Sequence, residues 1–237
     1  MKRSVWLTGI ATALAAGVLV AGVFQLAGAH SPQPPPTEDG CVGLTDEGCD
    51  AAIQAASNAF WSRFEEWIKQ FNDPDSTVNL RALPRLPSNS IFEPPQPSLK
   101  AALEHADLVL VATASAVRFD KPMTARVTLK IDRVLKGSTG STLEIAMGGG
   151  PAPAGNWDEV DLVFDENAPL LLPSDRAVLF LRYEDSIQSY LVQSFSGEYL
   201  VDSAGKVQAL ELNPFAAEVN GQSVDEFAAV IESTLAE

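Results

Sequence analysis

The sequence predicts a mainly β protein: a small closed barrel of antiparallel strands with flanking helices, preceded by an amphipathic helix and an N-terminal hydrophobic segment. Residues 98–237 contain six or seven short apolar or alternating runs, which turn residues separate. No two of these runs have a crossover helix between them, which predicts antiparallel pairing. The alternation slips phase at residues 133–135, which indicates a β-bulge. A closed barrel would protect the edges of such short strands.

The N-terminal segment, residues 1–29, predicts export. Lys2 and Arg3 precede an apolar stretch, residues 4–24, and small residues follow up to Ala29. This order is typical of a secretory signal that is cleaved between Ala29 and His30. The stretch is also long enough to cross a bilayer, so a retained anchor is the alternative. Under both interpretations the remainder lies outside the cytoplasm, secreted or held at the membrane only by this segment.

Residues 30–49 form a proline-rich spacer followed by a cysteine loop. Cys41 and Cys49 are the only cysteines of the chain, and outside the cytoplasm a close pair favours a disulfide. Closing so short a loop would stabilise it by about 2–3 kcal/mol. The alternative, a redox site, normally has Cys-x-x-Cys spacing, which is absent here.

Residues 50–72 predict an amphipathic helix with an unusually aromatic apolar stripe, and residues 73–97 predict a proline-rich linker or surface strap. Trp61 and Trp67 are the candidate contact residues of the helix. Packing against the main domain is the preferred interpretation, and docking of a partner is the second. A lipid surface comes third, because such helices are rich in Lys and Arg and this one is not.

The main domain, residues 98–237, begins and ends with a predicted helix. Ser98 caps the first helix, and Ser223 with Glu226 forms a capping box for the last, whose buried face is expected to contain Phe227, Val230, Ile231 and Leu235. Strands are expected at residues 108–117, 125–136, 143–147, 176–183, 190–195, 198–201 and 206–212, with a hairpin turn at 202–205.

Three runs of this domain resemble a known architecture: ADLVLV (106–111), ARVTLKIDRVLKG (125–137) and DRAVLFL (175–181). They are similar to exported bacterial domains of unassigned function with an OB-like barrel, related to netrin modules and tissue metalloproteinase inhibitors. The resemblance spans residues 98–212 and implies the OB-like fold. Such inhibitors insert an N-terminal cysteine into the protease, whereas Cys41 lies inside this chain, so inhibition is not implied.

Residues 148–174 predict a long loop that contains the other candidate contact residues: Trp157, Asp158, Asp161 and Asp165. Its carboxylates could bind a cation or act as a hydrolase pair, but a solvated acidic face is the preferred interpretation. Val160, Leu162 and Phe164 alternate with acids, which predicts a short half-buried strand. Tyr183, Tyr190, Tyr199 and Trp157 are candidates for an aromatic ligand face, with core packing as the alternative.

Composition narrows the function. A net charge of −15 argues against nucleic-acid binding. Only two histidines are present, and His105 has no nucleophile motif beside it, so we expect no catalytic triad, no metal and no cofactor. The preferred function is a non-enzymatic binding module of the cell envelope for a peptide, glycan or protein. The alternatives are an envelope hydrolase that uses loop carboxylates, and a scaffold that recruits a partner through the aromatic helix.

Overall fold

The computed structural model describes residues 46–88, 95–121, 124–153, 160–165, 169–193, 196–210 and 212–237. Their elements, in chain order, are α1 (Asp46–Asn72), the 3-10 turn η2 (Leu80–Ala82), β1 (Arg85–Ser88), α2 (Leu99–His105), β2 (Leu108–Lys121), β3 (Thr124–Lys136), β4 (Thr142–Gly148), β5 (Gly150–Pro153), β6 (Val160–Asp165), β7 (Arg176–Glu184), β8 (Ser189–Val192), β9 (Glu198–Val201), β10 (Val207–Ala209), α3 (Ala216–Val219) and α4 (Val224–Leu235). The protein is mainly β, as predicted.

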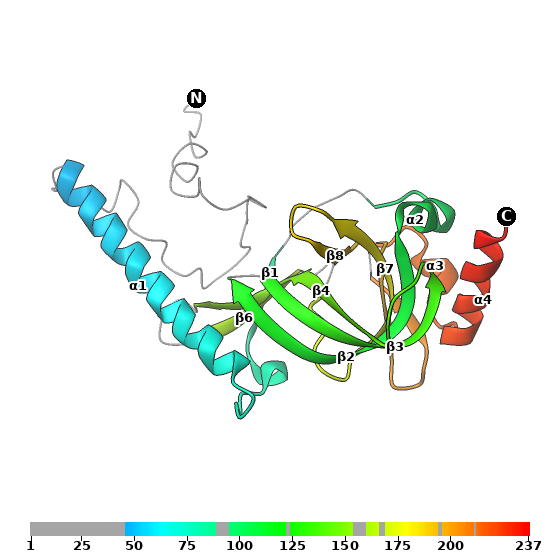
Figure 1. Cartoon of the computed structure of the whole chain (residues 1–237), viewed down its shortest axis with the longest axis horizontal. Coiled ribbons are helices and arrows are strands. Elements are labelled where there is room, and N and C mark those ends of the chain that lie inside the picture. Colours follow the sequence, from blue (N-terminus) through cyan, green and yellow to red (C-terminus); the bar gives the residue numbers. More distant parts are fainter. Residues whose placement is uncertain are drawn as a thin grey trace.

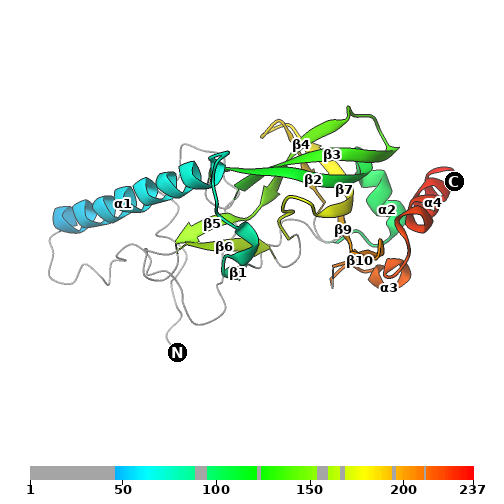
Figure 2. The same ribbon diagram turned by 90° about the horizontal axis from the view of Figure 1, so that it is seen from below.

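The larger of the two sheets has seven strands in the order β10-β9-β7-β2-β3-β4-β8, and β8 also pairs with β7. Strands β2, β3, β4, β8 and β7 therefore form a closed circuit of pairings, which we call the strand ring. Two residue pairs join β4 to β8, Ile145 with Tyr190 and Ala146 with Leu191. Because β9 and β10 continue the sheet from β7, the whole is a large curved sheet rather than a simple barrel (Figures 1 and 2).

The expectation of purely antiparallel pairing is wrong at two places. β4 pairs with β8 in parallel, and so does β1 with β6 in a second, three-stranded sheet ordered β1-β6-β5. The lack of crossover helices did not exclude parallel pairing, because strands β5, β6 and β7 connect β4 to its parallel partner β8. The short strand expected at Val160, Leu162 and Phe164 is confirmed as β6, but the expected long loop at residues 148–174 is wrong in part, because β5 lies in it and pairs with β6.

Apolar side chains form one core on each face of the strand ring. The inner core joins alternate residues of β2, β3, β4 and β7 with Leu162 of β6 and the buried run Leu170, Leu171 and Leu172. The outer core joins the other face of β2, β7 and β9 with α2, α3 and α4. Tyr199 is central to the outer core, since its ring lies 5.3 Å from that of Phe180 and 4.8 Å from that of Phe227.

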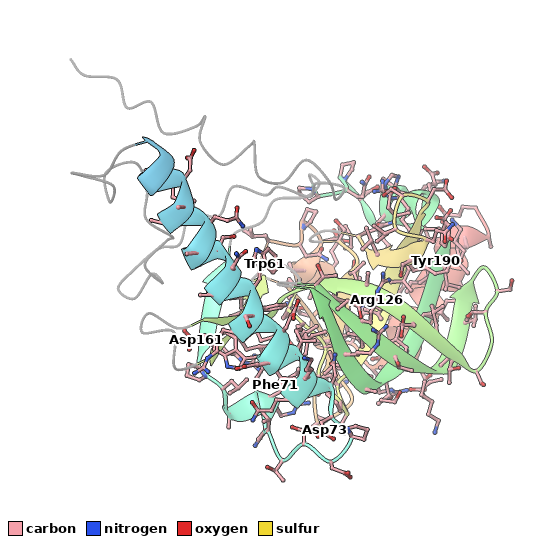
Figure 3. The ribbon with its side chains drawn as sticks, turned by 60° about the vertical axis from the view of Figure 1, so that its left-hand side comes forward. Trp61, Phe71, Asp73, Arg126, Asp161 and Tyr190 are labelled. Carbon is pink, nitrogen blue, oxygen red and sulfur yellow. The ribbon has the colours of Figure 1, made fainter. Side chains whose placement is uncertain are left out.

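The C-terminal end of α1 packs on β2, while its N-terminal turns extend away from the sheet (Figures 1 and 3). Phe71 contacts Phe119 edge to face at 6.0 Å. The Asn72 amide pairs with the backbone of Phe119: its Nδ2 donates to the Phe119 carbonyl at 2.8 Å, and its Oδ1 accepts from the Phe119 N–H at 2.9 Å. Packing within the molecule, the preferred interpretation of this helix, is thus observed for its last turns.

We expect Asn72→Ala to lower the free energy of unfolding by about 2 kcal/mol, because both hydrogen bonds to a half-buried strand edge are lost. Urea unfolding of the full chain measures this. Asn58→Ala is the matched control, because Asn58 is exposed and accepts a hydrogen bond from Gln54 within the same helix. Equal unfolding midpoints for the two variants would contradict the role of Asn72.

Local helix signals are confirmed. Ser98 accepts from the Ala101 N–H, and Ser223 with Glu226 forms the expected capping box. The predicted buried face of α4 is half wrong, because Val230 and Leu235 are exposed, while Val224 and Ala228 are buried beside Phe227 and Ile231. Within the described ranges, no helix is both long and apolar enough to cross a membrane. The predicted signal segment and the Cys41 end of the predicted disulfide lie outside those ranges.

Candidate functional site

The candidate contact residues chosen from the sequence have different positions. Trp157 and Asp158 lie outside the described residues. Asp161, in β6 opposite Ala152 of β5, is only 7% exposed, and Asp165 is the last residue of β6. A buried Asp161 does not fit the solvated acidic face that was expected.

The aromatic helix and the acidic segment are brought together, although about a hundred residues separate them in the chain. α1 contacts β5, the antiparallel partner of β6, so the helix that contains Trp61 and Trp67 lies beside the strand pair that contains Asp161 (Figure 3). Trp67 is buried, whereas Trp61 remains 43% exposed and meets Phe64 edge to face at 6.3 Å. The buried side chain of Trp67 helps to hold α1 on the rest of the protein, so the role of Trp67 is structural.

The three candidate tyrosines separate into two groups. Tyr199 is fully buried, and its hydroxyl donates to the Ser196 carbonyl at 2.9 Å. Burial raises the pKa of Tyr199 well above the usual range, so it stays a neutral donor. Tyr183 and Tyr190 instead face each other across β7 and β8, with ring centroids 5.3 Å apart in an edge-to-face arrangement. We call them the tyrosine pair.

The tyrosine pair is preorganised and accessible. Tyr190 packs partly against the inner core, while Tyr183 is 44% exposed. The cross-strand contact between the rings restrains both side chains, which reduces the conformational freedom that is lost on binding. In Figure 3 Tyr190 lies well away from Trp61 and Phe71 of α1. The tyrosine pair is therefore a surface separate from the helix contact.

Charged groups lie near the backbone of Tyr183. Asp107, the residue before β2, accepts a hydrogen bond from the Tyr183 N–H at 2.7 Å through its Oδ2. Glu184 follows in the chain, and hydrogen bonds from the side chain and backbone of Ser186 lower the pKa of its carboxyl group. Arg182 Nη1 lies 3.2 Å from His105 Nε2, and its Nη2 lies 3.9 Å from a Glu184 oxygen. Because successive residues of a strand point to opposite faces, the side chains of Arg182 and Glu184 lie on the face of β7 opposite to the Tyr183 ring.

Sequence reasoning missed a buried polar group at the crossing from β8 to β9. Gln193, Ser196, Glu198 and Asn213 are all nearly inaccessible to solvent. Gln193 Nε2 donates to the Ala102 carbonyl at 3.3 Å, and Ser196 Oγ accepts from the Gln96 N–H at 3.0 Å. These contacts tie the crossing to α2 and to the strap before it. The sequence signal for this cluster was the presence of polar residues, such as Gln193, within the strand expected at residues 190–195.

Other polar features are already committed to internal contacts. On the outer face of β2 and β3, Asp120 pairs with Arg118 and, at 3.0 Å, with Arg126, while Arg176 pairs with Asp132 at 3.0 Å. An open depression of about 500 Å³ includes Glu226 and Asn220. The first serves the capping box and the second accepts from the Ala209 N–H at 2.6 Å. Among the side chains that the structure describes, no group of three potential metal ligands occurs.

A scan against protein-family models and a search of curated proteins found no match to this chain.

Proposed function

We propose that the chain is a non-enzymatic binding module that contacts a polypeptide partner through the tyrosine pair. The observation that carries this proposal is the accessibility of Tyr183 within a fixed aromatic pair. Large exposed aromatic rings on rigid strands are a common source of binding energy in protein interfaces, where tyrosine is enriched.

We further propose an OB-like barrel for residues 98–212. The closed circuit β2-β3-β4-β8-β7, with its parallel β4–β8 pair, supports this assignment. OB folds bind ligands on their strands and on the loop between their last two strands. The tyrosine pair flanks the β7–β8 turn, which is the corresponding loop. The fold by itself assigns no ligand.

An extracytoplasmic location completes the proposal, and it rests on Lys2, Arg3 and the apolar stretch of residues 4–24. A partner at the cell envelope follows from that location. The hydrolase alternative has less support, because Asp161 is buried rather than presented to solvent. Recruitment through the aromatic helix has less support too, because Trp67 is used for internal packing.

Panning a library of displayed random heptapeptides against the full chain in detergent tests the proposal. We expect enriched peptides to bind the parent and to lose roughly ten-fold or more in affinity on Tyr183→Ala, because one central aromatic contributes over 1.4 kcal/mol.

Leu212→Ala is the matched control, since Leu212 is another exposed apolar residue on the opposite end of the sheet order, after β10. The Leu212→Ala variant should bind the enriched peptides with the same affinity as the parent. The proposal is wrong if no peptide is enriched, or if Tyr183→Ala and Leu212→Ala bind equally well.

A further inference from the structure

We infer, resting on the proposed binding function, that Asp107 is the positioning residue of the tyrosine pair. It holds the end of β7, and Tyr183 with it, in the orientation that a partner meets. Its carboxylate acts through a hydrogen bond to the backbone of Tyr183 rather than on the partner.

The end of β7 extends beyond its pairing with β2. The last residue pair between the two strands is Leu108 with Leu181, whereas Tyr183 lies further along β7. Asp107 continues the contact past this point. Its N–H donates to the Leu181 carbonyl at 2.9 Å, and its Oδ2 accepts from the Tyr183 N–H at 2.7 Å. Asp107 therefore joins the backbone of Tyr183 to the start of β2.

Asp107 is itself held from the β3 side of β2. Lys136, the last residue of β3, donates from its Nζ to the carbonyls of Leu103 and Ala106 at 2.6 and 2.5 Å. The backbone of Gly137 lies close by, because an added Cβ there would be 2.7 Å from the Asp107 carbonyl oxygen. These contacts fix the backbone from which the Asp107 carboxylate reaches β7, as a supporting residue requires.

The other ring of the pair has a separate anchor. Tyr190 pairs with Ile145 of β4 and packs partly against the inner core. The β7–β8 hairpin is thus held at Tyr190 by β4 and at Tyr183 by Asp107. Without the second anchor, Tyr183 is free to move relative to Tyr190, and binding must then order it again at a cost in affinity.

Two variants of residue 107 test the role of the hydrogen bond. Asp107→Ala removes the acceptor, whereas Asp107→Asn keeps it, since the amide oxygen can still accept from the Tyr183 N–H. We expect the heptapeptides enriched on the full chain to bind Asp107→Ala roughly five-fold more weakly, and Asp107→Asn within about two-fold of the parent, because one hydrogen bond is lost in the first variant only.

Asn72→Ala is the matched control for a loss of stability. It removes the two hydrogen bonds between α1 and Phe119, and it leaves the β7–β8 hairpin intact. Its peptide affinity should equal that of the parent.

A second measurement reports on the rings directly. The chain contains three tyrosines, so labelling with 3-fluorotyrosine gives a fluorine NMR signal for each of them, which single replacements by phenylalanine assign. In Asp107→Ala the signals of Tyr183 and Tyr190 should shift or broaden, while that of the buried Tyr199 stays in place. All three signals should stay in place in Asp107→Asn and in Asn72→Ala, because a loss of stability alone does not reorient the pair.

The outcomes separate this inference from the proposed function. If Tyr183→Ala loses the peptides but Asp107→Ala binds them as the parent does, or leaves the fluorine signals unchanged, the binding surface stands and the positioning role is wrong. If Asp107→Asn is weakened as much as Asp107→Ala, the peptides depend on the charge of residue 107, and the positioning role is again wrong. If no peptide is enriched, or if Tyr183→Ala binds every peptide as the parent does, both proposals are wrong.

Discussion

Replacing Phe227 by alanine is expected to lower the free energy of unfolding by about 4 kcal/mol. Phe227 is fully buried on α4, and its ring lies 4.8 Å from that of Tyr199 at the centre of the outer core. Phe180 and Phe215 contact the same tyrosine. These aromatic side chains come from four separate segments: β7, β9, α4 and the residues before α3. No single element can therefore move to fill the cavity that the substitution leaves.

Equilibrium unfolding in urea, followed by circular dichroism, measures the loss. Val230→Ala is the matched control on the same helix, because Val230 is 40% exposed, and its effect should stay within about 0.5 kcal/mol. The sequence alone places both residues on one buried face. If both variants lost a similar free energy of unfolding, the result would support the buried face of α4 expected from the sequence and would contradict the face observed in the structure.

Gly197→Ala is expected to destabilise the chain by about 3 kcal/mol. Strands β8 and β9 use the same edge of β7, so the chain must cross between them. At the crossing, the Phe180 N–H donates to the Gly197 carbonyl at 2.8 Å, and the Gln193 N–H donates to the Phe180 carbonyl at 3.0 Å. A Cβ on residue 197 would overlap the Gln193 carbonyl oxygen and lie 2.6 Å from its backbone nitrogen.

Backbone atoms of Gln193 cannot move away as a flexible side chain would. The segment that crosses from β8 to β9 must therefore shift, and β8 must shift with it. Thermal unfolding of the variant measures the cost. Gly140→Ala is the control, because the nearest atom to its added Cβ, the Thr142 carbonyl oxygen, is 3.9 Å away. Parent-like stability of Gly197→Ala would mean that β8 and β9 do not share the β7 edge as described.

Features of the fold that depend on nearby residues were predictable from the sequence. The caps at Ser98 and Ser223 involve residues three positions away, so the sequence contains both partners. The irregularity expected at residues 133–135 is present, as register shifts between β2 and β3. The turn at 202–205 is a hairpin in which Gly205 has a φ of 75°, a conformation that glycine adopts easily.

Strand β5 was missed because proline disfavours strands. Pro151 and Pro153 lie in this strand, which a central position in a sheet would not tolerate. The order β1-β6-β5 makes β5 an edge strand, and an edge needs hydrogen bonds on one side only. The same reason explains Pro87 in β1 at the other edge.

The candidate site was only partly predictable, because exposure depends on distant packing. Tyr183, Tyr190 and Tyr199 have the same chemistry in the sequence. The pairing of β9 with β7 places Tyr199 beneath α4, whereas Tyr183 lies near the end of β7, paired with Tyr190 of β8. No local sequence pattern distinguishes the buried tyrosine from the exposed one. Likewise, the approach of α1 to the β5–β6 hairpin joins segments that are far apart in the chain.

The most direct test of the binding surface is backbone hydrogen exchange of the full chain, with and without a saturating enriched heptapeptide. If the tyrosine pair is the contact, exchange slows in residues 181–192 of the β7–β8 hairpin and around Asp107, and stays unchanged in α1 and the β5–β6 hairpin. Slowing confined to residues 46–72, or to residues 150–165, would show that the peptide binds elsewhere and would contradict the account.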